Sequence, residues 1–134
     1  MNDHLRTMHA EEVMNRDVQW ADADENLRAA AERMAQHHIR TLLVRGDHEG
    51  DLPGILSSKD IVNLVGGHGV DVLDELHVRD ACTTPAICVS EATHVHDCIG
   101  LMRMNGVRRM PVLRGQQVVG ILSMSDIFAR MLRA

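Results

Sequence analysis

Apolar residues recur at intervals of three and four positions in several stretches of the chain, and this spacing places them on one face of an α-helix. Two of these stretches contain Leu27, Ala31, Met34 and Ala35, and Val95, Ile99 and Met102. The same spacing returns after Ser57 and after Ser123, in the sets Ile61, Leu64 and Val65, and Ile127, Met131 and Leu132. The pattern predicts amphipathic helices with one apolar side. The apolar residues of the two later helices, at 60–65 and 126–132, are not expected to be fully buried by the pair, which predicts a dimer.

Short aliphatic runs separated by glycine-containing turns predict the strands of two hairpins. The runs cover residues 41–44 and 52–56 in the first half, and 110–113 and 117–122 in the second half. Two further short runs, at 18–20 and 86–89, predict a leading strand before the first helix of each half. Each half is therefore expected to fold as strand, helix, strand, strand, helix.

The two halves are copies of one pattern. Residues 27–44 align with 95–112 at an offset of 68, and residues 54–61 align with 120–127 at an offset of 66. The two extra residues of the first half fall in the sequence 46–51, where a hairpin loop absorbs them at little cost. A single repeat would leave one face of its sheet uncovered, so pairing of the two repeats is expected.

The expected fold class is α/β, of the α+β kind. It consists of two repeats, each a small mixed three-stranded sheet with two helices, packed as a pseudo-two-fold pair. The chain of 134 residues is long enough for one domain with a real core. We expect one module spanning residues 1–134, with the first repeat at about 8–66, a linker at about 67–76 and the second repeat at about 77–132.

Composition and charge exclude several classes of function. The chain has one tryptophan, one phenylalanine and a net charge of -5, so it lacks both base-stacking platforms and a surface that attracts phosphate backbones. Nucleic-acid binding is therefore not expected. Its apolar runs are far shorter than the roughly 20 residues that cross a bilayer, so no membrane segment is expected.

Cysteines and histidines are the remaining candidates for chemistry. Cys82, Cys88 and Cys98 are odd in number and irregularly spaced, and no cationic and apolar leader precedes them, which favours a reducing cytoplasm. No base or orienting acid accompanies them at a recognisable spacing, so catalysis is not expected and they are interpreted as small buried hydrophobes. His37-His38 and His94-x-His96 have poor geometry for a shared metal, because neighbouring residues on a helix point in different directions. No metal site is expected.

The doubled pattern, Met/Ile-x-Arg-x-x-x-Val followed by Gly-Ile-Leu-Ser-x-x-Asp, resembles the CBS domain family, named after cystathionine beta-synthase. The resemblance covers essentially all of residues 8–132. It implies a stand-alone Bateman module, in which two repeats enclose two clefts that bind AMP, ATP, other adenosyl compounds or NAD. It also implies a homodimer with no catalysis and no required cofactor.

The resemblance further implies roles for individual residues. Ser57 and Ser123 are expected at the phosphate or ribose of a nucleotide, and Asp60 and Asp126 at its ribose hydroxyls. Basic contacts to phosphate are implied for Arg40, Arg108 and Arg109, and apolar walls around adenine for Val18, Ile55, Ala86, Ile87 and Ile121. The second repeat has the pair Arg108-Arg109, whereas Arg40 is followed by Thr41. The site that contains Asp126 is therefore expected to bind nucleotide more tightly.

Other interpretations of these residues remain open. Ser-x-x-Asp before an apolar run is also a capping box, in which the serine and the aspartate satisfy free N–H groups at the start of a helix. Arg40 and Arg108 can equally be solvated edge-strand residues that discourage aggregation. At the level of function, the leading hypothesis is a sensor of adenine nucleotides that signals to an unknown effector protein. The alternative is a structural protein–protein interaction module with empty or vestigial clefts.

Overall fold

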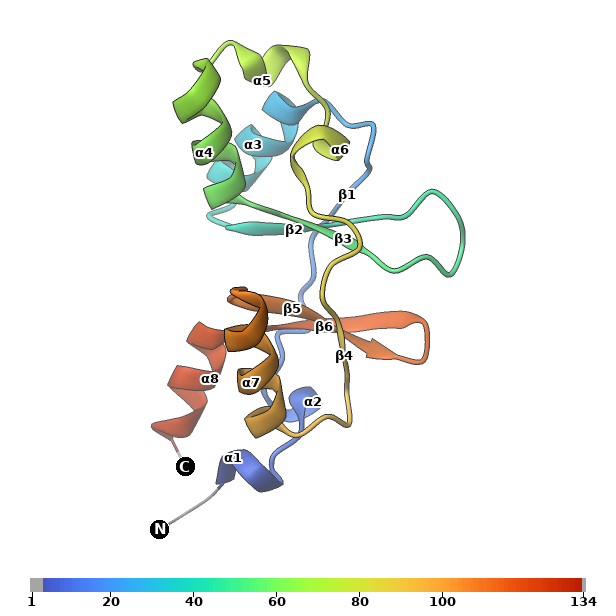
Figure 1. The fold of residues 1–134 in the computed structure, drawn as a ribbon, viewed down its shortest axis with the longest axis vertical. Coiled ribbons are helices and arrows are strands. Elements are labelled where there is room, and N and C mark those ends of the chain that lie inside the picture. The colour runs from blue at the N-terminus through green and yellow to red at the C-terminus, as the bar shows by residue number, and fades with distance from the viewer. Residues whose placement is uncertain (1–3, 134) are drawn as a thin grey trace. The chain divides into compact units, whose positions relative to one another are not determined.

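Helices and strands follow one another in the same order in both halves of the chain (Figure 1). The structure, a computed structural model, describes residues 4–133. In the first half the order is β1 (Trp20–Ala21), α3 (Leu27–Gln36), β2 (Thr41–Val44), β3 (Gly54–Ser57) and α4 (Ser58–His68). In the second half it is β4 (Val89–Ser90), α7 (Val95–Asn105), β5 (Arg109–Arg114), β6 (Gln117–Ser123) and α8 (Met124–Met131). The predicted order of elements is confirmed.

Short helices precede the first strand of each half. They are α1 (His4–Thr7) and α2 (Ala10–Val13) before β1, and α5 (Val72–Glu75) and α6 (Val78–Ala81) before β4. No helix within residues 4–133 is both long enough and apolar enough to cross a membrane.

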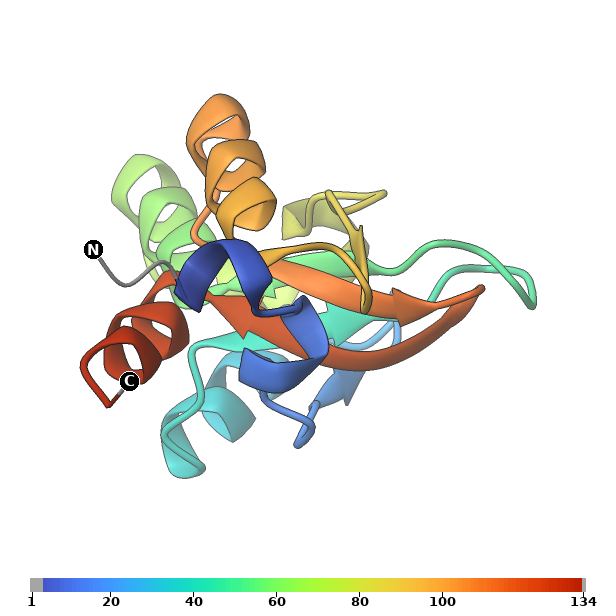
Figure 2. The same ribbon diagram turned by 90° about the horizontal axis from the view of Figure 1, so that it is seen from below.

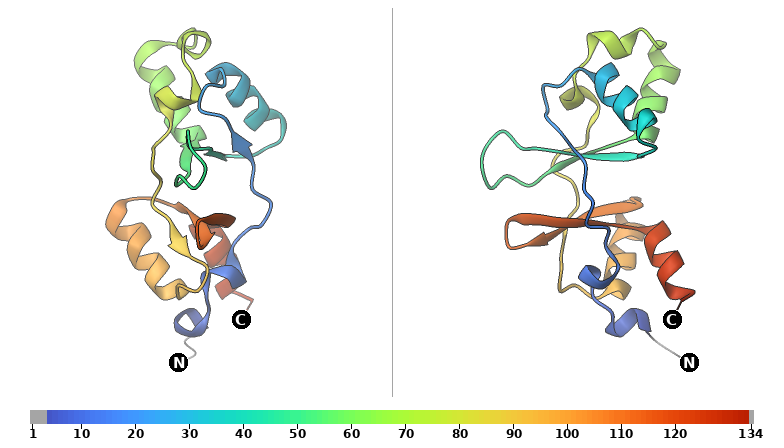
Figure 3. Two further views of the ribbon diagram at one scale, coloured as in Figure 1. Left: turned by 90° about the vertical axis from the view of Figure 1, so that its right-hand side faces the viewer. Right: turned by 180° about the vertical axis from the view of Figure 1, so that it is seen from behind.

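Each half forms a mixed three-stranded sheet in which the first strand of the hairpin is central. In one sheet β1 pairs parallel to β2 and β2 pairs antiparallel to β3; in the other, β4, β5 and β6 repeat the arrangement. The first hairpin has a long connection at 45–53, whereas Gly115 and Gln116 alone join β5 to β6 (Figure 3). The extra residues of the first half therefore lie in its hairpin loop, as predicted.

The leading strands begin later than the sequence predicts. Only Trp20 and Ala21 pair with β2, and β4 begins at Val89. The backbone N–H of Val18 instead donates to the carbonyl of Arg16, at 3.0 Å, in a local turn. The N–H of Ala86 donates to the carbonyl of Pro53, at 2.9 Å. Both N–H groups are used outside the strand ladder, which explains the shift.

The chain divides into two compact units, each with its own core. The first-repeat unit consists of Gln19–Ala86. The second-repeat unit consists of the N-terminal residues up to Val18 together with the chain from Ile87 onward. Within each unit the helices lie on one side of the sheet, as Figures 1 and 2 show for α7 and α8.

The segment before each first strand packs on the elements of the other repeat. In the second-repeat unit, the N–H of Ala10 donates to the carbonyl of Thr93 and that of Val95 to the carbonyl of Met8, both at 2.8 Å. The first-repeat unit forms the equivalent bonds with residues from the later segment: Leu27 to Leu76 and Val78 to Glu25, both at 2.9 Å. The opening segment of each repeat therefore belongs to the compact unit of the other repeat.

The buried face of each long helix is narrower than the sequence pattern indicates. In α3, Ala30 is buried together with Leu27 and Met34, while Ala31 is only partly buried and Ala35 is exposed. Positions 27, 30 and 34 lie along one line of the helix surface, which is the side that faces the sheet. The same spacing selects Cys98 in α7, and Ile99 is only partly buried.

Helix α8 departs most from its expected apolar face. Ile127 is buried, but Met131 and Leu132 are 46% and 67% exposed, and Phe128 is 60% exposed. Of the apolar side formed by Ile127, Met131 and Leu132, this chain buries Ile127 and leaves the other two exposed. Helix α8 packs against β6 and α2.

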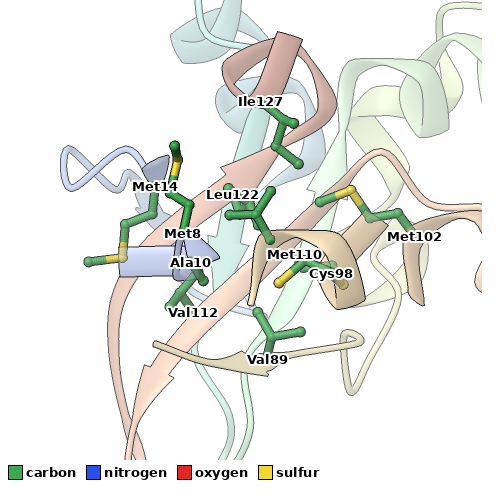
Figure 4. Packing of buried hydrophobic residues seen from close by; sticks show 11 residues of the cluster. Met8, Ala10, Met14, Val89, Cys98, Met102, Met110, Val112, Leu122 and Ile127 are labelled. Atoms are coloured by element: carbon green, nitrogen blue, oxygen red, sulfur yellow. The ribbon is translucent and has the colours of Figure 1, made fainter. Parts of the chain in front are cut away.

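The core of the second-repeat unit is aliphatic and rich in sulfur (Figure 4). Met102 and Met110 are completely buried, and Met8 and Met14 reach the same cluster from the N-terminal segment. Flexible thioether side chains fill irregular space well, which suits a core with few aromatic residues. Burial raises the pKa of the Cys98 thiol to about 11, and Asp97 adds to this effect. Cys98 therefore behaves as a buried hydrophobe.

Candidate functional site

The Ser-x-x-Asp motif of the second repeat lies where β6 ends and α8 begins. Ser123 is the N-cap of α8, and its hydroxyl oxygen accepts a hydrogen bond from the N–H of Asp126 at 3.0 Å. The carboxylate of Asp126 is half-buried and accepts no hydrogen bond from any residue within 4–133. It is therefore an open acceptor beside the N–H groups at the start of a helix.

In the equivalent motif of the first repeat, the serine and aspartate side chains each accept a hydrogen bond from the backbone N–H of the other residue. The hydroxyl of Ser57 accepts from the N–H of Asp60 at 3.1 Å, and a carboxylate oxygen of Asp60 accepts from the N–H of Ser57 at 2.9 Å. This is a complete capping box at the start of α4. The capping-box interpretation is thus confirmed for the first repeat, whereas only its serine half forms in the second.

Two arginines lie next to the open motif. Arg109 faces Ser123 across the β5–β6 ladder, and the carbonyl of Arg108 accepts from the N–H of Met124 at 2.9 Å. The side chain of Arg108 is exposed and forms no ion pair in the part of the chain that the structure describes. These backbone positions bring the predicted basic pair to the N-terminus of α8.

The first repeat has a neutral residue at the matching position. Thr41 faces Ser57 across the β2–β3 ladder, and the carbonyl of Arg40 accepts from the N–H of Ser58 at 2.9 Å. The hydroxyl of Thr41 is buried without a hydrogen-bond partner among the described residues. Arg40 and Arg108 both precede central strands, so the edge-strand interpretation of these arginines is wrong.

Near each motif, a segment from elsewhere in the chain forms backbone hydrogen bonds with the last strand of the sheet. Asn15 exchanges two backbone hydrogen bonds with Ile121, at 2.8 and 2.9 Å, which brings Val18 into the unit that contains Asp126. Thr83 makes the same pair of bonds with Ile55, both at 2.9 Å. The predicted residues are thereby divided between the units. Val18, Ile87, Arg108, Arg109, Ile121, Ser123 and Asp126 belong to the second-repeat unit, and Arg40, Ile55, Ser57, Asp60 and Ala86 to the first-repeat unit.

The pairing of Asn15 and Thr83 with the strands was not predicted from the sequence. A signal was present in the glycine of each Gly-Ile-Leu-Ser motif. A Cβ at Gly120 would lie 3.0 Å from the carbonyl oxygen of Asn15, and one at Gly54 would lie 3.1 Å from that of Thr83. A glycine inside a strand marks a close approach of another backbone. Gly54 and Gly120 therefore indicated that another segment of the chain packs against each of these strands.

Neither metal binding nor thiol catalysis is supported by the arrangement of side chains. No three histidine, cysteine, aspartate or glutamate residues within 4–133 are placed to share a metal ion. Burial raises the pKa of the Cys82 thiol, and the nearby Asp60 carboxylate also raises it. A reactive cysteine needs the opposite shift, because the thiolate is the nucleophile.

Comparison with known proteins identifies the repeats. The CBS domain pattern matches residues 10–67 and 78–133. An uncharacterized protein from Methanopyrus kandleri is 30% identical over 92% of this chain. The hexameric CBS-CP12 protein from bloom-forming cyanobacteria is 30% identical, with a TM-score of 0.84 over 90% of this chain. The chain spans 62% of the length of the first protein and 66% of the second.

A further solved structure shares the fold at lower identity. It is the CBS domain pair of protein MJ0100 in complex with 5'-methylthioadenosine and S-adenosyl-L-methionine. It is 22% identical, with a TM-score of 0.78 over 94% of this chain and 96% of its own. Both repeats of the present sequence are covered by the family pattern, and both fold as the pattern requires. The chain therefore belongs to the CBS domain family and contains one pair of CBS domains.

Proposed function

We propose that this chain is a regulatory sensor whose better site, in the second-repeat unit, binds an adenine nucleotide such as AMP or ATP. The observation that carries the proposal is the open carboxylate of Asp126 beside the start of α8 and the pair Arg108-Arg109. A carboxylate offers only acceptors and suits the two hydroxyls of a ribose. Free N–H groups at a helix start and arginine side chains suit a phosphate.

Each residue has a separate task in this proposal. Asp126 accepts from the ribose, Arg108 and Arg109 neutralise phosphate, and Ser123 holds the helix start in place through its cap. Val18 and Ile121 supply apolar surface for adenine, and the backbone bonds between Asn15 and Ile121 fix the segment that carries Val18. The adenosyl ligands of the MJ0100 pair support this class of ligand.

The output of the proposed sensor is a change in affinity for an effector protein, with no chemical step. A bound nucleotide shifts the equilibrium between two arrangements only as far as its affinities for them differ. We propose that the chain acts as a homodimer in the cytoplasm, and that the effector recognises the nucleotide-bound arrangement.

The first test compares AMP with adenosine by calorimetric titration of the purified protein at low salt. AMP should bind about tenfold more tightly or better, because a charge-assisted contact contributes about 1.5–3 kcal/mol. Arg108→Gln should remove most of this preference. Arg114→Gln is the matched control, because Arg114 ends the strand that Arg108 precedes and is paired with Glu91. Equal affinities for AMP and adenosine would contradict the phosphate role, and no binding of either would contradict the sensor.

The exposed side of α8 supports a second candidate function, assembly without a ligand. Phe128, Met131 and Leu132 form an apolar strip on the helix that follows the Asp126 motif. Contiguous apolar surface of this kind marks an interface.

The dimer is tested by light scattering with and without AMP. We expect a dimer at micromolar concentration, and Phe128→Glu should convert it to a monomer, because the substitution places a charge in the apolar contact. Met104→Glu on α7 is the control, because Met104 is 82% exposed and lies away from α8 in the sequence. A monomer under all conditions would rule out the dimer, and a dimer that binds no nucleotide would favour the purely structural function.

A further inference from the structure

The two repeats differ most in the connection inside their hairpins, and a pocket lies at the longer connection. The pocket belongs wholly to the first-repeat unit and has a volume of about 420 Å³. Its apolar wall includes Val44, Leu52 and Pro85. Val44 ends β2, whereas Ser57 and Asp60 lie at the other end of the hairpin, so the pocket is separate from the Ser-x-x-Asp motif. Its volume falls within the range of about 300–1,000 Å³ that is usual for small-molecule sites.

The loop that borders the pocket has a defined shape. The carboxylate of Asp51 accepts a hydrogen bond from the N–H of His48 at 2.9 Å. Gly46 packs directly against Asp51, where a Cβ at position 46 would collide with the aspartate side chain. The loop is therefore closed by its own contacts, and Asp47 and Leu52 line the pocket beside it.

Among the described residues, some charged side chains of the pocket form ion pairs and others do not. Arg45 is held by Asp22, at 3.2 Å, and by the ring of Trp20, whose centroid is 5.2 Å away. Arg79 and Asp47 also line the pocket, yet neither forms an ion pair with any residue of the described chain. Arg79 and Asp47 thus border a single pocket without an ion-pair partner among the described residues, and the carboxylate of Asp51 beside them accepts the N–H of His48.

We propose that this pocket binds a free α-amino acid with an apolar side chain. The ligand carboxylate would pair with Arg79, its ammonium group with Asp47, and its side chain would lie on Val44, Leu52 and Pro85. A molecule with both charges can pair with two protein charges that do not pair with each other, and a planar guanidinium matches a carboxylate well. The hydroxyl of Thr84, also at the pocket, is a further hydrogen-bond partner. This site is independent of the nucleotide site proposed above.

The proposal is tested by NMR titration of the isotope-labelled full chain with L-leucine and L-phenylalanine. At least one of them should shift the backbone signals of Val44, Arg79 and Thr84. The matching amide, which lacks the carboxylate, should bind at least about tenfold more weakly, because a charge-assisted contact is lost. The matching acid without its ammonium group should lose a similar factor.

Variants decide whether the named residues form the site. Arg79→Gln and Asp47→Asn should each weaken amino-acid binding about tenfold or more and leave AMP binding unchanged. Arg103→Gln on α7 is the control, because Arg103 is exposed and lies in the other unit. The proposal is overturned if neither amino acid shifts these signals at millimolar concentration. It is equally overturned if acid and amide bind alike or if Arg79→Gln binds as the unaltered chain does. Loss of AMP binding by Asp126→Ala tests the nucleotide site alone, so failure of one proposal is distinguishable from failure of the other.

Discussion

Replacing Asp126 with alanine should weaken AMP binding by about 5- to 150-fold, whereas replacing Asp60 with alanine should change it much less. The expected loss corresponds to about 1–3 kcal/mol, the cost of removing the acceptor for the ribose hydroxyls. Asp126 has no competing partner among residues 4–133, while Asp60 already accepts the N–H of Ser57. A nucleotide at Asp60 would have to share the carboxylate with that bond, and Thr41 offers it no charge.

The same two variants should have the reverse order in stability. Asp60→Ala removes one half of the capping box of α4 and should lower the free energy of unfolding by about 0.5–2 kcal/mol. Asp126→Ala leaves the cap made by Ser123 intact and should cost less. Calorimetric titration with AMP and thermal unfolding of both variants measure the two effects side by side. An equal loss of affinity from both variants, or a loss from Asp60→Ala alone, would show that the asymmetry between the sites is wrong.

Met102→Ala should lower the free energy of unfolding by about 2–5 kcal/mol, the cost of truncating a buried methionine and leaving a cavity. Met102 is completely buried on α7, in the cluster that also contains Met110 and Leu122. Met104→Ala is the matched control on the same helix, because Met104 is 82% exposed. It should change stability by no more than about 0.5 kcal/mol.

Urea unfolding followed by circular dichroism measures both methionine variants. The midpoint for Met102→Ala should fall clearly below that of Met104→Ala, while the slope of the transition stays the same. Similar midpoints for the two variants would mean that the arrangement of α7 on its sheet is wrong.

The elements themselves could largely be predicted from the sequence, because hydrophobic spacing reports which face of a helix or strand is buried. Residues 41–44 form the strand that the pattern predicts, and the hairpins lie in the predicted places. The leading strands were harder to predict. A strand of two residues carries almost no periodicity, and its bounds are set by which N–H groups find partners elsewhere, as those of Val18 and Ala86 do.

The residue types at the candidate site could be read from the sequence, but the hydrogen bonding of its two aspartates could not. The difference in charge between Arg108-Arg109 and Arg40-Thr41 is visible in the sequence. The difference between Asp60 and Asp126 is not, because both follow a serine at the same spacing. It depends on whether the carboxylate turns back to the N–H of that serine, which only side-chain geometry reveals. The pairing of Asn15 with Ile121 was also hidden, since it joins residues that are far apart in the sequence.

The segment before the first strand of each repeat packs in the unit of the other repeat. This arrangement imposes an order on folding during synthesis. The nascent chain holds every residue of the first-repeat unit once Ala86 has left the ribosome, so this unit is able to fold early. The residues before Val18 are made before those of the first-repeat unit, yet their partners Thr93 and Ile121 are made after it. Met8 and Met14 therefore have no core to pack against until the rest of the second-repeat unit has been made. These residues are therefore made before the first-repeat unit, yet they can reach their final packing only after it has been made.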